Sequence, residues 1–196
     1  FSKDDGDAGD DAVEVRFNDG AKARVNVNVR MEIPADPEAL VTIHGKFRSY
    51  DSLVRDTVKQ VVSESVILTA ALMSAEESYT TKRAEFSQMA DDQVRNGIYL
   101  TEADTIATKD SKTGESTYKQ IVRIQTNKDG TFDRKHSVLS QHGIRITQFV
   151  IKDIDYEDVV DQQIQPKQKA LMQVVAAKAQ AEKAVQDRLT AEEEGK

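Results

Sequence analysis

The sequence predicts an α+β fold: a curved antiparallel sheet with helices packed on one face, followed by a long alanine-rich C-terminal helix that starts a coiled coil. Three observations favour this class. Residues 13–33 alternate apolar and polar side chains around a turn, which is typical of a half-buried hairpin. Residues 36–97 carry apolar side chains at helical spacing. Residues 156–196 are helical in pattern and rich in alanine.

Composition excludes several classes of function. Lysine and arginine number 27 against 34 acidic residues, a net charge of -7, which argues against binding to nucleic acid phosphates or to anionic lipid. Cysteine is absent, which excludes disulfides, thiolate catalysis and cysteine-based metal sites. No stretch approaches the ~20 apolar residues of a membrane span, and no signal peptide is visible. Because the chain begins at Phe1, we expect a piece of a longer protein, with any membrane anchor outside it.

The N-terminal residues predict a solvated acidic loop. Residues Ser2–Asp11 hold five aspartates and two glycines. A calcium loop of the helix–loop–helix kind does not fit, because counting from Asp5 puts Asp10 and Arg16 where glycine and glutamate are needed. We therefore expect three segments. They are an acidic loop over 1–11, a globular domain over 12–155 with an insertion at about 101–141, and a helical extension over 156–196.

The alternation in residues 13–33 predicts an antiparallel hairpin that ends at Pro34. Its turn is Asn18-Asp19-Gly20, a composition that favours a tight reversal. One face of the hairpin should enter the core together with apolar residues of the following helices. The predicted core members are Val25, Val27, Val29, Met31 and Ile33 from the strand, and Val58, Val62, Phe86 and Val94 from the helices.

Three helical segments should follow the hairpin. Asp36-Pro37 predicts the start of a short helix whose inner face is Leu40, Ile43 and Phe47. Residues 50–72 carry a continuous apolar stripe at three- and four-residue spacing; helix is favoured over a buried valine-rich strand by length and phase. Ser74 and Glu77 predict a capping box at the start of a third helix that ends at Gly97. The inner face of this third helix should be Tyr79, Phe86, Met89, Ala90 and Val94.

Strand character returns after Gly97. Residues 98–100 and 118–125 predict strands around a polar turn at Asp110–Gly114, and Asn127–Gly130 predicts a loop. The last strand should cover residues 143–154. Its apolar residues change from even to odd positions near Thr147-Gln148, which predicts a β-bulge there.

From Tyr156 the pattern is helical to the C-terminus. Pro166 lies inside it, so the helix either restarts there or kinks. Beyond Pro166, small residues recur at heptad spacing, which favours close helix approach, although a solvated helix without a partner remains the alternative. The predicted oligomer interface is Ala170, Val174, Ala177, Ala181 and Ala184.

No catalytic or cofactor motif is present. The chain has no glycine-rich phosphate loop, no nucleophile elbow and no paired-histidine metalloprotease motif. Its histidines, His44, His136 and His142, are poorly spaced for a metal. With aromatic residues at 6% and no tryptophan, base-stacking platforms are not expected. We therefore expect no enzyme, no cofactor, no metal and no nucleic-acid partner.

Several stretches, taken in order, resemble the SPFH domain. This domain, also called band 7 or the prohibitin-homology domain, occurs in stomatins, prohibitins, flotillins and the HflK/HflC proteins. The run VNVNVRMEIP at 25–34 resembles the family's first long strand, and 50–77 its long helix and cap. Arg83-Ala84-Glu85-Phe86 is similar to the family's R-x-E-[FI] motif. The run HGIRITQFVIKDIDYEDVVDQQIQPKQKA at 142–170 resembles its final strand and the start of its coil. The insertion at about 101–141 departs from many members.

This resemblance implies a non-enzymatic, membrane-associated scaffold. Such proteins assemble into large rings or cages that organise a membrane patch, and some regulate membrane proteases. The resemblance implies three kinds of partner: further copies or a paralogous SPFH subunit, a membrane protease as in some members, and a membrane contacted through segments outside this chain. The alternative is a soluble adaptor or viral structural subunit that assembles through the same domain without enclosing a membrane.

Overall fold

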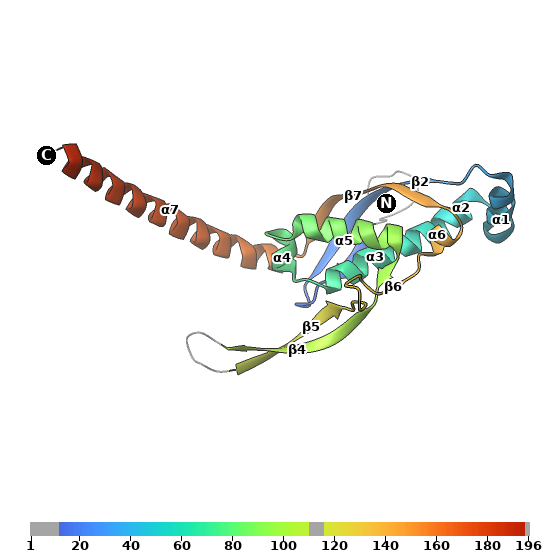
Figure 1. Cartoon of the computed structure of the whole chain (residues 1–196), viewed down its shortest axis with the longest axis horizontal. Helices are drawn as coiled ribbons and strands as arrows, with labels where there is room; N and C mark the ends of the chain where they lie inside the picture. Colours follow the sequence, from blue (N-terminus) through green and yellow to red (C-terminus); the bar gives the residue numbers. More distant parts are fainter. Residues whose placement is uncertain (1–11, 110–115, 195–196) are drawn as a thin grey trace. The chain divides into compact units, whose positions relative to one another are not determined.

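The computed structural model describes residues 12–109 and 116–194 (Figure 1). It confirms an α+β fold of antiparallel sheets and helices. The chain forms two compact units that divide between Tyr156 and Glu157. The predicted acidic loop over 1–11 and the predicted turn at Asp110–Gly114 lie outside the described residues.

The main sheet of the first unit is open and three-stranded, with the order β1-β2-β7. Its strands are β1 (Val13–Arg16), β2 (Lys22–Glu32) and β7 (Arg145–Tyr156). All neighbours are antiparallel, and Val13 pairs with Val25 in the first hairpin. The hairpin that the alternation predicts is therefore confirmed, and the last strand of the domain completes its sheet.

The hairpin turn is held by the helices beside it. Gly20 has a φ of +87°, a conformation that costs glycine little. The Asn18 amide donates to the Met73 carbonyl at 3.1 Å, and the Ala75 amide donates to the Asp19 carboxylate at 2.9 Å. These two bonds fix the end of the sheet to the segment that joins two helices.

Strand β7 carries two bulges. Its register against β2 shifts between Asn26 and Val27, where Lys152 is left unpaired, and between Arg30 and Met31, where Thr147 is left unpaired. The bulge predicted near Thr147-Gln148 is confirmed. The one at Lys152 was not predicted, although the apolar positions change phase there a second time, from Phe149 and Ile151 to Ile154 and Tyr156.

The first helical segments follow the prediction with one addition. The elements are α1 (Pro37–Phe47), α2 (Tyr50–Leu53), a π-helical turn η1 (Val54–Val58) and α3 (Lys59–Ala71). Asp36 caps α1, as expected, by accepting from the amide of the third residue after it. Residues 50–72 are helical rather than a strand. The π-helical turn within them was not predicted.

The third predicted helix is in fact two helices, α4 (Ala75–Tyr79) and α5 (Arg83–Asn96). The capping box of Ser74 and Glu77 is present at the start of α4. The prediction of one continuous helix is wrong because the chain turns at residues 80–82. There the Lys82 amide bonds five residues back to the Glu77 carbonyl, and the Lys82 ammonium pairs with the Glu77 carboxylate at 3.0 Å.

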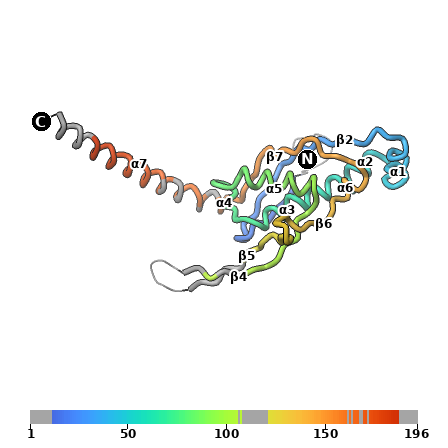
Figure 2. Tube along the Cα trace, viewed as in Figure 1, coloured from blue at the N-terminus to red at the C-terminus, as the bar shows by residue number. Residues whose placement is uncertain are grey.

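Helices α3 and α5 run beside each other and cover one face of the sheet, as the trace in Figure 2 shows. Residues that were predicted to form the core and are fully buried are Val25, Val27, Val62, Phe86 and Val94, each at 0% exposure. Val58 is also buried.

The second half of β2 departs from the predicted core. Val29, Met31 and Ile33 are only half-buried. Val29 and Met31 line a cavity together with Val54 and Val58 of η1, so the helices do not cover them completely.

The inner faces of α1 and of the third predicted helix also need correction. Leu40 was expected on the inner face of α1, but it is 43% exposed, and within that helix only Ile43 is buried. Tyr79 and Met89, both expected on the inner face of the third helix, are half-buried rather than buried.

The insertion forms ladders of its own. Strand β3 (Ile98–Tyr99) pairs with β6 (Arg134–Lys135), and β4 (Thr101–Lys109) pairs with β5 (Ser116–Ile124). The short helix α6 (Val138–Gln141) leads back to β7. The strands predicted at 98–100 and 118–125 are thus present, but the described parts of them do not join the main sheet.

The second unit is a single helix, α7 (Asp158–Glu194). It continues through Pro166, so a restart of the helix at that residue is excluded. At 37 residues it is about 55 Å long, from a rise of 1.5 Å per residue.

Candidate functional site

The predicted oligomer interface lies on one side of α7. Its five members (Ala170, Val174, Ala177, Ala181 and Ala184) are all in the helix and all exposed. At 100° per residue they fall within a stripe about 80° wide. Val185, 54% exposed, lies at the margin of this stripe and extends it, and heptad spacing alone did not identify it. The stripe is a surface of small side chains on which a second helix has room to approach.

The side of α7 opposite this stripe also carries apolar residues. Met172 is 74% exposed and Val175 is 58% exposed. Ala179 lies on this opposite side as well, because it is two residues and so about 200° from Ala177. This pair of alanines offers a matched comparison of the two sides of one helix.

Histidines and carboxylates of the described residues do not gather into a metal centre. In the described part of the chain, no group of three or more metal-ligating side chains comes together. His142 stacks edge-on against Phe47, with ring centres 5.4 Å apart, and its Nε2 lies 2.6 Å from the Lys46 ammonium. Burial and the nearby Lys46 charge lower the pKa of His142, which favours the neutral imidazole that can accept from Lys46. We interpret this contact as structural.

A polar cluster joins α5 to the short ladder of β3 and β6. The Arg134 guanidinium lies 2.7 Å from Asp92 and stacks on the Tyr99 ring at 4.6 Å from its centre. The Tyr99 hydroxyl donates to the same Asp92 carboxylate, and the Asn96 amide donates to it at 2.7 Å. The carboxylate thus has three donors.

These contacts shift the pKa values of Tyr99 and Asp92 in opposite directions. Burial together with the bond to Asp92 raises the pKa of Tyr99 to about 12. Burial alone would raise the pKa of Asp92, but the bonds from Tyr99, Arg134 and Asn96 outweigh it and lower that pKa. The cluster therefore holds a stable carboxylate and a neutral phenol, which suits an anchor for the insertion better than proton transfer near neutral pH.

We expect Asp92→Asn to destabilise the domain at pH 7 and to matter less in acid. A carboxyl with a lowered folded-state pKa contributes stability above its unfolded value of 3.8, and this contribution is lost as the pH falls through the folded-state pKa. Urea unfolding of wild type and Asp92→Asn at pH 7 and at successively lower pH measures the gap between their free energies of unfolding. A gap that stays constant or widens toward pH 3 would contradict the assignment of an ionised Asp92.

Taken together, the fold and these surfaces define an α+β domain followed by a long helix with an exposed small-residue stripe. The chain belongs to the SPFH domain / Band 7 family, because the model of that family matches residues 4–185. Members of this family are membrane-associated. No curated protein matches the chain. Within the described residues, we find no helix with both the length and the hydrophobicity needed to cross a bilayer.

Proposed function

We propose that this chain is the assembly module of a membrane-associated scaffold that forms a large ring or cage and has no enzymatic activity. Membership in the SPFH family carries this proposal. The exposed stripe on α7 supports it, since an exposed helix face of small residues is suited to packing against another helix. The partner at this stripe would be the same helix of a second copy or of a paralogous SPFH subunit.

The interface would work by close approach rather than by burial of large side chains. Alanine lets two backbones come near each other, so that many weak dispersion contacts add up along the helix. Each alanine removes little apolar area from water, so a single pair of helices would associate weakly. A membrane tether outside this chain would raise the local concentration and make such weak contacts sufficient for a closed assembly.

Regulation of a membrane protease belongs to the same proposal. An assembly that encloses a patch of membrane would control which membrane proteins reach a protease held inside or outside it. In this mechanism the chain positions other proteins and carries out no chemical step of its own.

Cysteine cross-linking tests the α7 interface. This chain contains no cysteine, so a single Ala177→Cys substitution in the full-length protein places one thiol of this region on the stripe. We expect mild oxidation in native membranes to give disulfide-linked dimers of this variant, because alanine-lined helices bring Cα atoms within the about 4.4–6.8 Å that a disulfide spans.

Ala179→Cys is the matched control on the opposite side of α7. It carries the same substitution on the same helix and should cross-link poorly. Equal yields from the two variants, or a higher yield from Ala179→Cys, would show that the stripe is not where the helices meet.

A further inference from the structure

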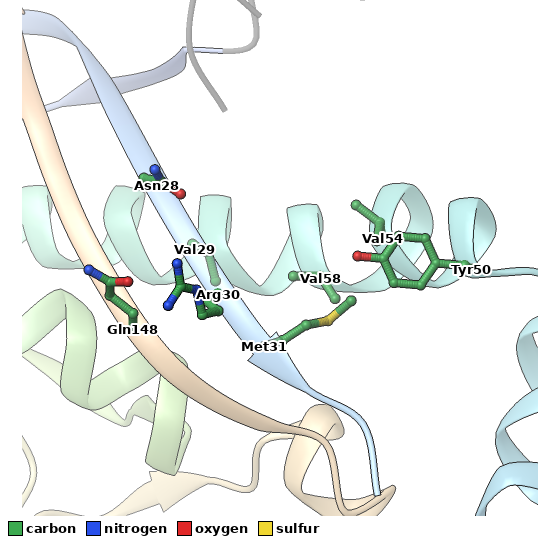
Figure 3. Close-up of a pocket in the computed structure, with 8 residues that line it drawn as sticks. All are labelled: Asn28, Val29, Arg30, Met31, Tyr50, Val54, Val58 and Gln148. Carbon is green, nitrogen blue, oxygen red and sulfur yellow. The ribbon is translucent and has the colours of Figure 1, made fainter. Parts of the chain in front are cut away.

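A cavity of about 260 Å³ lies beside the second half of β2 (Figure 3). Its walls differ in chemistry. One wall is apolar and is formed by Met31 of β2 with Val54 and Val58 of the π-helical turn η1. The other is polar and includes Arg30 of β2 and Gln148 of β7, which are opposite each other in the ladder. Successive residues of one strand thus contribute to two chemically distinct walls.

Among the described residues, no strand pairs with the outer edge of β2 at this cavity. Alternate residues of an antiparallel strand direct their N–H and C=O groups to opposite neighbours. The Arg30 carbonyl faces β7, because it accepts from the Thr147 hydroxyl at 3.2 Å. Val29 and Met31 therefore face the other edge, where the described pairing with β1 ends at Val25. In the described part of the chain, nothing pairs with the main chain of Val29 or Met31 on that edge.

No described residue compensates the charge at this edge either. Two other arginines of the sheet are paired: Arg24 lies 3.4 Å from Glu14, and Arg145 lies 3.3 Å from Glu32. Arg30 is exposed, and no acidic group among the described residues forms an ion pair with it. A π-helical turn in the facing wall is a further feature that is frequent at functional sites.

We propose that this edge of β2 binds an extended peptide segment of a partner protein in which apolar and acidic residues alternate. The peptide adds a strand beside Val29 and Met31 and forms main-chain hydrogen bonds with them. Because successive side chains of a strand point to opposite faces, apolar residues of the peptide enter the cavity against Met31, Val54 and Val58. The acidic residues between them lie on the side of Arg30. Main-chain bonds supply affinity, and the two walls select the sequence.

Fluorescence anisotropy with defined peptides tests this proposal. The probe is a labelled octapeptide of alternating leucine and glutamate. Its comparisons are an octapeptide of alternating leucine and lysine, and one with four leucines followed by four glutamates. We expect the wild-type chain to bind the leucine–glutamate alternation at least about tenfold more tightly than either comparison, because only that peptide meets both walls with matching chemistry.

Charge reversal at Arg30 supplies the matched variants. Arg30→Glu should weaken binding of the leucine–glutamate peptide by roughly tenfold or more and favour the lysine peptide instead. Arg16→Glu is the control, an exposed arginine of the same sheet on β1, and should leave the affinity within about twofold of wild type. Arg30→Gln, which removes the charge without reversing it, gives the same direction of change if Arg30→Glu does not fold.

Three peptide-binding results would overturn the proposal. They are no saturable binding of the leucine–glutamate peptide by the wild-type chain, equal binding of the block peptide, or equal losses at Arg30 and Arg16. A wild-type dimer in analytical ultracentrifugation that Val29→Pro dissociates would also overturn it, because the edge would then be filled by a second copy of the chain.

Discussion

Val62→Asp should abolish cooperative folding of the first unit at room temperature. Val62 lies in α3 and has no exposed surface. An aspartate there would bury a carboxylate without a partner, which costs about 3–5 kcal/mol or more, and a domain of this size has only about 5–15 kcal/mol of stability. Far-ultraviolet circular dichroism with urea titration would show the loss of the transition.

Ile67→Asp is the control for this experiment. It lies five residues further along α3 and is 42% exposed, so its carboxylate remains in contact with water. This variant should fold with a transition close to that of wild type. A Val62→Asp protein that is soluble and unfolds cooperatively near the wild-type midpoint would show that α3 does not pack as described.

Gly97→Ala should be the second most damaging change, at a cost of at least about 2 kcal/mol. Gly97 ends α5 with a φ of +106°, a conformation that side chains rarely adopt. A Cβ at this position would lie 2.1 Å from the Lys135 carbonyl oxygen, which belongs to the backbone of β6 and has little freedom to move. Strain in the backbone and steric overlap therefore act together.

Gly45→Ala is also a glycine-to-alanine substitution, but we expect it to have the opposite effect on stability. Gly45 lies in α1, and a Cβ there would meet no atom of the described residues within 4 Å apart from the adjacent backbone of its own helix. Alanine should therefore stabilise the helix by about 0.5–1 kcal/mol. Thermal unfolding of the two variants compares them directly. A Gly97→Ala protein that melts at or above the wild-type temperature would contradict the close approach of α5 and β6.

Local patterns in the sequence predicted those parts of the fold that depend on neighbouring residues. The hairpin over β1 and β2 follows from alternation around Asn18–Gly20, and the capping box follows from Ser74 and Glu77. The bulge at Thr147 was visible as a change of phase in the apolar residues. Each of these features has its cause within a few residues of the chain, which is why one sequence is enough to find it.

Features that depend on tertiary packing were missed. The π-helical turn at Val54–Val58 leaves no distinct residue pattern, because its valines fit an ordinary helical stripe equally well. The half-burial of Val29 and Met31 depends on how far α2 and η1 lie from β2, and the alternation of apolar residues does not indicate this distance. The break between α4 and α5 depends on which carbonyl accepts from the Lys82 amide, and here it is the carbonyl of Glu77, five residues back.

The two candidate surfaces differ in the same way. Heptad spacing predicts the stripe on α7 because small residues recur along one element, and its role as an interface between helices stays a prediction. The cavity beside Arg30 combines β2, β7 and η1, which are far apart in sequence, so no local pattern indicates it. Arg30, which forms no ion pair with any described residue, and the edge of β2 beyond its described pairing with β1 define that surface only when they are seen together in three dimensions.

Electron microscopy of the full-length protein in detergent tests the central claim of assembly through α7 most directly. Three proteins are compared: wild type, Ala177→Arg on the stripe and Ala179→Arg on the opposite side of the helix. We expect closed rings or cages for wild type and for Ala179→Arg, and dispersed or open particles for Ala177→Arg with the first unit still folded. Closed Ala177→Arg particles indistinguishable from those of wild type would show that the stripe is not an assembly surface.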